Sequence, residues 1–104
     1  DAVRRICSQA LIVRRTGAHG CVLHPVGGGP IEVPGFVRAV VDTTGAGDTH
    51  TGVLVAGLLD GLDVVEAARR ANAAAAHAVA CTGPAQAPLR EEIDRFLRES
   101  DERL

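Results

Sequence analysis

Aromatic side chains are almost absent from this chain of 104 residues, which has 2 Phe and neither Trp nor Tyr. Proteins that bind single-stranded nucleic acid stack the bases on aromatic side chains, so the composition argues against that class. Basic residues are not in excess either, because 11 Lys and Arg stand against 13 Asp and Glu. A general nucleic-acid binder needs a basic stripe that neutralises phosphates. We therefore expect no nucleic-acid partner.

Cysteines and long apolar runs are also scarce. The cysteines Cys7, Cys21 and Cys81 are odd in number and have no C-x-x-C spacing, which indicates neither a disulfide framework nor a zinc site. Reduced thiols in a cytoplasmic protein are the simpler interpretation. No apolar run approaches the roughly 20 residues of a membrane-spanning helix, and no charged-then-apolar leader opens the chain. We expect no membrane association.

Hydrophobic residues make up 46% of the chain, enough for the core of one small domain built from Ala, Val, Leu and Ile. Short apolar runs predict a buried parallel strand, a hairpin around a glycine-rich loop and a further strand, at residues 10–13, 21–24 with 31–34, and 37–41. Helical patterns cover residues 1–9, 49–59, 63–80 and 89–98, followed by a polar, frayed tail. This alternation predicts an α/β layered domain that is incomplete, because the chain opens inside a helix.

The predicted helices carry boundary and packing signals. Gly61 stands where a glycine ends a helix, and Asp63 with Glu66 has the capping-box pattern. The helix at 49–59 is mostly apolar and is expected to be buried. Two helix faces are expected to pack inward, one of Ala71, Ala74, Ala75 and Ala78 and one of Ile93, Phe96 and Leu97.

The segment Asp42-Thr-Thr-Gly-Ala-Gly-Asp48 lies between an apolar strand pattern and an apolar helix pattern. Gly45 and Gly47 let the backbone approach a ligand closely and permit positive φ. The first amides of the helix lack intrahelical partners and lie at the positive end of its dipole, which favours an anion. Asp48 beside such a site could accept a proton from a hydroxyl in phosphoryl transfer, or it could simply cap the helix. The local pattern leaves both interpretations open.

The wider pattern favours the first interpretation. Residues 41–49, Val-Asp-Thr-Thr-Gly-Ala-Gly-Asp-Thr, resemble the carboxyl-terminal signature of the ribokinase, or phosphofructokinase-B type, carbohydrate kinases. Residues 72–78, 82–88 and 16–20 are similar to the adenine-side helix, the closing loop and the nucleotide-contacting turn of that family. The resemblance covers essentially the whole chain. It implies that residues 1–104 are the carboxyl-terminal, ATP-binding and catalytic-base portion of a ribokinase-like three-layer α/β/α (Rossmann-like) fold.

The resemblance also implies an activity, the transfer of the γ-phosphoryl group of ATP, with Mg²⁺, to a hydroxyl of a sugar or nucleoside. Asp48 would be the base, and the amides of Gly45, Ala46 and Gly47 would form the anion hole. The residues that would border the nucleotide are Thr16, Gly17, Gly20 and Asn72. A monovalent cation such as K⁺ would match a site formed by Asp42, Thr44, Ala78, Cys81 and Gly83.

Several residues depart from the family pattern. His50 stands where Phe is usual, and we expect it to be buried and neutral, with substrate contact as the alternative. Arg15 stands where a small polar residue is common; solvated surface is the expectation and phosphate contact the alternative. Ala87 lacks a hydroxyl that can complete the cation site. The remaining histidines, His19, His24 and His77, are not at metal-ligand spacing.

The substrate half of the family, with its lid of strands and its magnesium-linked Asn-x-x-Glu segment, has no counterpart in these residues. The resemblance therefore leaves the sugar or nucleoside undefined, and a homodimer would form through the lid half. An alternative function is a non-catalytic nucleotide-binding remnant or regulatory module. A redox dinucleotide domain is disfavoured, because the third glycine of G-x-G-x-x-G would fall on His50.

Overall fold

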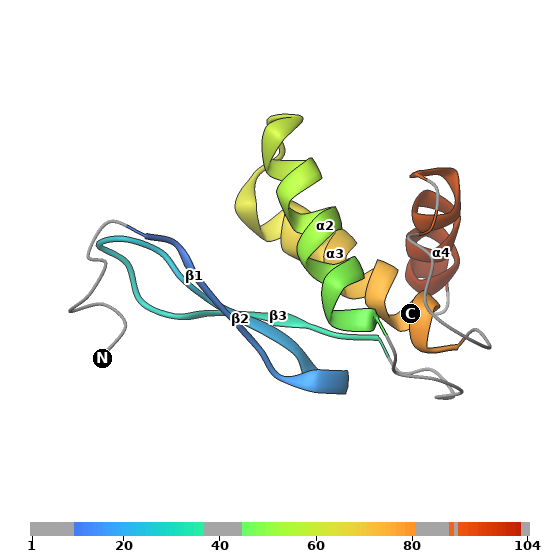
Figure 1. Cartoon of the computed structure of the whole chain (residues 1–104), viewed down its shortest axis with the longest axis horizontal. Helices are drawn as coiled ribbons and strands as arrows, with labels where there is room; N and C mark the ends of the chain where they lie inside the picture. The colour runs from blue at the N-terminus through green and yellow to red at the C-terminus, as the bar shows by residue number, and fades with distance from the viewer. Residues whose placement is uncertain (1–9, 37–44, 81–87, 89, 103–104) are drawn as a thin grey trace.

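The computed structural model describes residues 10–36, 45–80, 88 and 90–102. Within these residues, three strands precede three α-helices (Figure 1). The elements are β1 (Ile12–Arg15), a 3₁₀ turn η1 (Gly17–His19), β2 (Gly20–His24), β3 (Ile31–Pro34), α2 (Ala46–Leu59), α3 (Val64–Val79) and α4 (Arg90–Glu102). The helix expected at 1–9 and the strand expected at 37–41 lie outside the described residues.

The three strands form an antiparallel sheet in the order β1-β2-β3. The hairpin predicted around the glycine-rich loop is confirmed as β2 and β3. The expectation of a buried parallel strand at 10–13 is not met within the described residues, because β1 begins at Ile12, is partly exposed and runs antiparallel to β2. The physical reason is the connection: the few residues after Arg15 can only reverse the chain, whereas a parallel pair needs a crossover of a dozen residues or more.

One face of the sheet packs against the helices. Side chains alternate between the two faces of a strand, and on this face Cys21, Leu23 and Val33 are at most 3% exposed. They form a cluster with Leu54 of α2 and the alanines at the start of α3. The described residues therefore make two layers, with the helices on one side of the sheet (Figure 1). This arrangement is consistent with part of an α/β fold, while the third layer stays a prediction.

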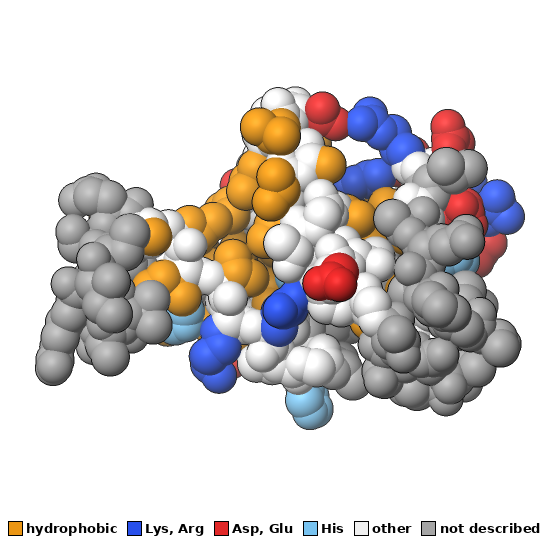
Figure 2. Space-filling view, in the orientation of Figure 1, with side chains coloured by type: hydrophobic (Ala, Val, Ile, Leu, Met, Phe, Trp, Pro, Cys, Tyr) orange, Lys and Arg blue, Asp and Glu red, His pale blue; other side chains and the backbone are white. Residues whose placement is uncertain are grey.

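Helix α2 begins three residues earlier than predicted, so Asp48 lies inside its first turn. The expected burial is wrong: only Thr49, His50, Leu54 and Gly57 are buried, and Leu59 is 82% exposed. The reason is that α2 contacts α3 and the sheet on one side only, so its apolar residues on the other side reach the surface. Figure 2 shows hydrophobic side chains gathered over this part of the molecule.

The end of α2 follows the predicted glycine signal. Gly61 has a φ of +85°, a conformation that glycine adopts readily. Its N–H donates to the carbonyl of Leu58 (3.1 Å), and the N–H of Leu62 donates to the carbonyl of Gly57 (3.0 Å). These two bonds form a Schellman motif, which satisfies the last carbonyls of α2 and turns the chain into α3.

Helix α3 starts directly after Asp63, as predicted, although Asp63 makes no side-chain capping hydrogen bond. Its alanines allow a close helix contact: a Cβ added to Gly57 of α2 would lie 3.1 Å from the Cβ of Ala67. Of the alanine face predicted on α3, Ala71, Ala74 and Ala78 are buried and Ala75 is partly buried. No described helix is both long and apolar enough to cross a membrane.

Helix α4 is amphipathic, as predicted, with Ile93 and Leu97 buried and Phe96 partly buried. It continues to Glu102, so the expectation of a frayed tail after Arg98 is wrong for the described residues. Two ion pairs join α3 and α4, and the one to Asp101 lies in the extension beyond Arg98. Arg69 contacts Asp101 in the last turn (2.5 Å), and Arg70 contacts Asp94 (2.6 Å).

Candidate active site

The glycine-rich segment places the start of α2. Gly45 is the N-cap residue, with a φ of +80° that favours glycine. The first helical hydrogen bond runs from the Thr49 N–H to the Gly45 carbonyl at 3.0 Å. The amides before Thr49 therefore have no intrahelical acceptor, and they lie at the positive end of the helix dipole. The geometry of residues 45–47 suits an anion.

Asp48 is exposed in this first turn. The alternative that it serves as the helix cap is wrong, because Gly45 occupies the N-cap position and no side chain makes a capping hydrogen bond there. Among the described residues, the ion pairs do not include Asp48. A carboxylate that is reachable from solvent, and that has no cationic partner in the described part of the chain, can accept a proton from a bound hydroxyl.

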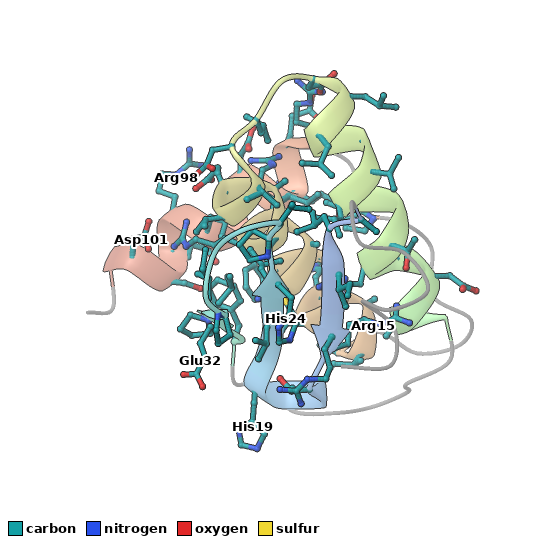
Figure 3. The ribbon with its side chains drawn as sticks, turned by 90° about the vertical axis from the view of Figure 1, so that its left-hand side faces the viewer. Arg15, His19, His24, Glu32, Arg98 and Asp101 are labelled. Atoms are coloured by element: carbon teal, nitrogen blue, oxygen red, sulfur yellow. The ribbon has the colours of Figure 1, made fainter. Side chains whose placement is uncertain are left out.

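Arg15 reaches this turn from the sheet. It pairs with Cys21 across the strands and so belongs to the inner face, which points toward the helices. Its Nη1 donates to the Gly47 carbonyl (2.5 Å) and to the Thr51 hydroxyl (3.1 Å). Figure 3 shows Arg15 beside α2, whereas His19 points away from the ribbon. Arg15 is exposed, as expected, but it is bound to α2 rather than only solvated.

The Thr16–Gly20 turn follows Arg15 directly. The Thr16 N–H donates to the Gly20 carbonyl (3.0 Å), which closes the turn. Gly20 has a φ of +103°, and a Cβ there would overlap the backbone carbonyl of Val33, so only glycine fits. Because Arg15 binds Gly47, the structure brings the two predicted loops, 16–20 and 45–48, into one region.

A buried polar network lies on the other side of α2. His50 is 4% exposed and Asn72 is 5% exposed. The His50 Nε2 lies 2.8 Å from the Asn72 Oδ1, and the Asn72 Nδ2 donates to the carbonyls of Val33 and Pro34, each at 3.1 Å. Because the amide nitrogen is the donor in both backbone bonds, Oδ1 is the acceptor, and the proton between the side chains belongs to His50 Nε2.

This network sets the ionisation of its members. Burial lowers the pKa of His50 below its ordinary value of 6.5, the hydrogen bond with Asn72 raises it in part, and the positive charge of Arg15 lowers it again. The expected burial of His50 is confirmed, and the lowered pKa favours the neutral form. Burial raises the pKa of the Cys21 thiol, against a lowering by its hydrogen bond with Asn72, so Cys21 is an uncharged core residue.

The other predicted site residues are placed as follows. Ala78 is 2% exposed near the carboxyl end of α3, where the N–H of Ala80 contacts the carbonyls of Ala78 and His77. Four proposed cation ligands, Asp42, Thr44, Cys81 and Gly83, lie outside the described residues, as does Ala87. Within the described ranges, no group of three or more His, Cys, Asp or Glu side chains is arranged to hold a metal ion.

Sequence reasoning did not find the contact between Arg15 and Gly47 or that between His50 and Asn72. A signal for the first was available. Strand alternation puts Arg15 on the same face as Val13, so a charged residue there must meet something polar on the helix side. The contact between His50 and Asn72 joins residues on two helices, and no local sequence pattern predicts it.

Comparison with known proteins identifies the family. The model of the pfkB family carbohydrate kinases matches residues 2–91. The chain belongs to the pfkB family. The resemblance seen in the glycine-rich segment is therefore confirmed, and α2 with its glycine start and Asp48 lies within the pfkB match.

The relatives support a kinase fold. The bifunctional protein HldE of Citrifermentans bemidjiense is 39% identical over 99 residues, covering 92% of this chain and 20% of HldE. A ribokinase of Arabidopsis thaliana, solved with ribose and ATP, has a TM-score of 0.79 at 32% identity, covering 85% of this chain and 29% of that one. A ribokinase-type protein of Escherichia coli, solved with ATP and Mg²⁺, has a TM-score of 0.79 at 30% identity, covering 86% and 29%. The chain spans about a fifth to three tenths of these pfkB-type proteins.

Proposed function

We propose that this chain is the carboxyl-terminal portion of an ATP-dependent kinase that transfers the γ-phosphoryl group to a hydroxyl of a sugar or nucleoside. The observation that carries the proposal is the position of Asp48, exposed in the first turn of α2 beside amides that lack intrahelical partners. A base next to an anion site is the arrangement that phosphoryl transfer to an alcohol requires. The family membership supplies the reaction class.

In this proposal, Asp48 accepts the proton of the attacking hydroxyl. The amides of Gly45, Ala46 and Gly47 donate hydrogen bonds to the phosphoryl oxygens as their charge is redistributed. Arg15 adds a full positive charge at the same turn, since its Nη1 already contacts the Gly47 carbonyl. The other N–H groups of this guanidinium would then donate to a phosphate oxygen, the kind of acceptor that Arg binds most strongly.

ATP fits these residues because its polyphosphate is an anion and the start of α2 carries positive potential. Mg²⁺ would neutralise phosphate charge, and it usually binds through substrate phosphates with only one or two carboxylates. We further propose that Thr16, Gly17 and Gly20 border the nucleotide. Asn72 is 5% exposed, and its amide is bonded to His50 and to two backbone carbonyls on the other side of α2, which does not support the predicted nucleotide contact of Asn72.

A monovalent cation such as K⁺ remains part of the proposal, held by oxygens of Asp42, Thr44, Ala78, Cys81 and Gly83. The described member of this set, Ala78, supports it, because carbonyls at the end of a helix suit a hard cation with oxygen ligands. If such an ion matters, activity of the full-length protein rises with potassium at fixed ionic strength, and Asp42→Ala abolishes that response.

The decisive experiment replaces the base. Asp48→Asn in the full-length protein is expected to lower turnover by at least ~10², the range for losing a general base, with little change in ATP affinity. Asp63→Asn is the matched control, because Asp63 is an exposed acid next to α3 that makes no capping hydrogen bond. Steady-state kinetics over a panel of sugars and nucleosides measures the effect.

Two outcomes would change the proposal. Turnover of Asp48→Asn equal to that of Asp63→Asn would remove Asp48 from the base role. Nucleotide binding by the wild-type protein without phosphoryl transfer to any member of the panel would favour the non-catalytic module instead.

A further inference from the structure

His50 and Asp48 belong to the same turn of α2 but face opposite environments. Asp48 is exposed, whereas His50, two residues later, is 4% exposed. Successive helix positions point in different directions around the axis, so the inward position of His50 determines where Asp48 points. Whatever fixes the imidazole therefore also fixes the direction of the carboxylate.

The contact that holds His50 is polar and directional. Its Nε2–H donates to the Asn72 Oδ1 at 2.8 Å, and Asn72 continues the chain of bonds to the Val33 and Pro34 carbonyls at the end of β3. Every buried polar side-chain atom among the described residues has a hydrogen-bond partner. Removing the His50 donor would leave the Asn72 Oδ1 unpaired in the interior, which is costly.

Arg15 also attaches the first turns of α2 by directional hydrogen bonds, to the Gly47 carbonyl and the Thr51 hydroxyl on the exposed side of the helix. On the buried side, the remaining contacts of α2 with its neighbours constrain it less than the contact of His50 does. Gly57 and Leu54 meet Ala67 and the core cluster through apolar surfaces, which are non-directional. A helix held only by such contacts can rotate or slide slightly at small cost. The hydrogen bond of His50 has a preferred angle and length, so it defines one rotation of the first turn.

We propose that His50 is a positioning residue: by donating to Asn72 it fixes the first turn of α2 against α3 and the end of β3, and so holds Asp48 and the amides of residues 45–47 in place. The consequence for turnover rests on the proposed kinase function. The consequence for the helix does not, because it follows from the hydrogen bonds alone.

Three variants of the full-length protein separate positioning from stability. His50→Phe keeps a bulky ring but has no donor. His50→Gln keeps an N–H close to the Nε2 position and so can still donate to Asn72. Leu54→Val is the matched control, because Leu54 is a buried residue one turn further along α2 whose described contacts do not include Asn72.

The measurements are kcat, the KM for ATP, the Tm, and hydrogen exchange of the backbone amides in the first two turns of α2. We expect His50→Phe to lower kcat by about ten- to a hundredfold through misplacement of the base, with a much smaller change in KM. It should also speed exchange in those two turns. His50→Gln should restore most of both properties, and Leu54→Val should lower the Tm while leaving kcat and this exchange near wild type.

The proposal is overturned if His50→Phe changes kcat and local exchange no more than Leu54→Val does. It is also overturned if His50→Gln restores nothing. Should His50→Phe not fold, His50→Asn replaces it, since its shorter amide cannot reach Asn72. A wild-type protein without phosphoryl transfer would contradict the proposed function, and the exchange data would still decide whether His50 positions α2.

Discussion

Helices α2 and α4 are almost equal in length, with 14 and 13 residues, yet they are held in opposite ways. Helix α4 is rich in charge and buries an apolar stripe that contains Ile93 and Leu97. Helix α2 is rich in apolar residues but buries few of them, and two polar contacts attach its first turns. These contacts come from Arg15, on a strand, and from Asn72, on another helix.

The difference shows how a site helix can be positioned. The place of α4 depends on its own amphipathic pattern, with ion pairs added at the rim. The place of α2 depends on residues 32 and 22 positions away in the sequence. Directional bonds to distant elements suit the proposed role of α2, in which the first turn presents the Asp48 carboxylate and the amides of residues 45–47 at a defined point.

The largest expected effect concerns the apolar residues of the two helices. Leu97→Ala in α4 should lower the free energy of unfolding by about 2–5 kcal/mol, because it opens a cavity in the core. Leu59→Ala in α2 should change it by no more than about 0.5 kcal/mol, because that side chain lies at the surface. Thermal unfolding of the full-length protein measures both. Equal losses would mean that another part of the protein covers α2.

The next effect tests the polar attachment of α2 from the sheet. Arg15→Gln should weaken binding of a non-hydrolysable ATP analogue about tenfold or more, the usual size for hydrogen bonds to charged groups. Arg14→Gln removes the same charge from the neighbouring residue, which points to the other face of β1, and should change little. Calorimetric titration gives the affinities, and adenosine should bind both variants alike. Equal affinities of the two variants for the analogue would mean that Arg15 only attaches α2 to the sheet and does not bind phosphate.

The close contact between α2 and α3 gives a smaller effect. Gly57→Val should cost about 1–3 kcal/mol of stability, because its side chain would press on Ala67 and Leu62. Gly52→Ala, in the same helix with no atom within 4 Å of the added Cβ, should stabilise by about 0.5–1 kcal/mol. Chemical denaturation of both variants tests the pair. A tolerated Gly57→Val would show that α2 and α3 can move apart.

The smallest effect is a dependence of stability on pH that comes from His50 of α2. His50 has a lowered pKa in the folded protein, so below its ordinary value of 6.5 the unfolded chain takes up a proton that the folded chain does not. Stability should therefore be complete above pH 6.5 and decline as the pH falls toward the lowered pKa. His50→Gln should flatten this decline in Tm between neutral and mildly acidic pH. Parallel profiles for the two proteins would contradict the assignment.

Local patterns predicted much of the fold. The hairpin of β2 and β3 followed from short apolar runs around glycines. The end of α2 followed from Gly61, and the start of α3 followed from Asp63. Such signals depend on residues a few positions apart, so they can be recognised in the sequence without knowledge of the tertiary structure. The direction of β1 and the exposure of α2 did not follow, because both depend on which neighbour lies alongside.

The candidate site also has some features that the sequence predicted and others that depend on tertiary contacts. The sequence by itself determined the family, the glycine start of α2 and the acid that follows it, because these lie within one contiguous motif whose residue types dictate the local backbone. Only the tertiary structure decided that Arg15 reaches Gly47 and that His50 donates to Asn72. Those contacts join a strand and two helices, and packing of the sheet against α3 selects which polar groups meet. Backbone propensity acts along the chain, whereas hydrogen bonds across it exist only once the layers have packed.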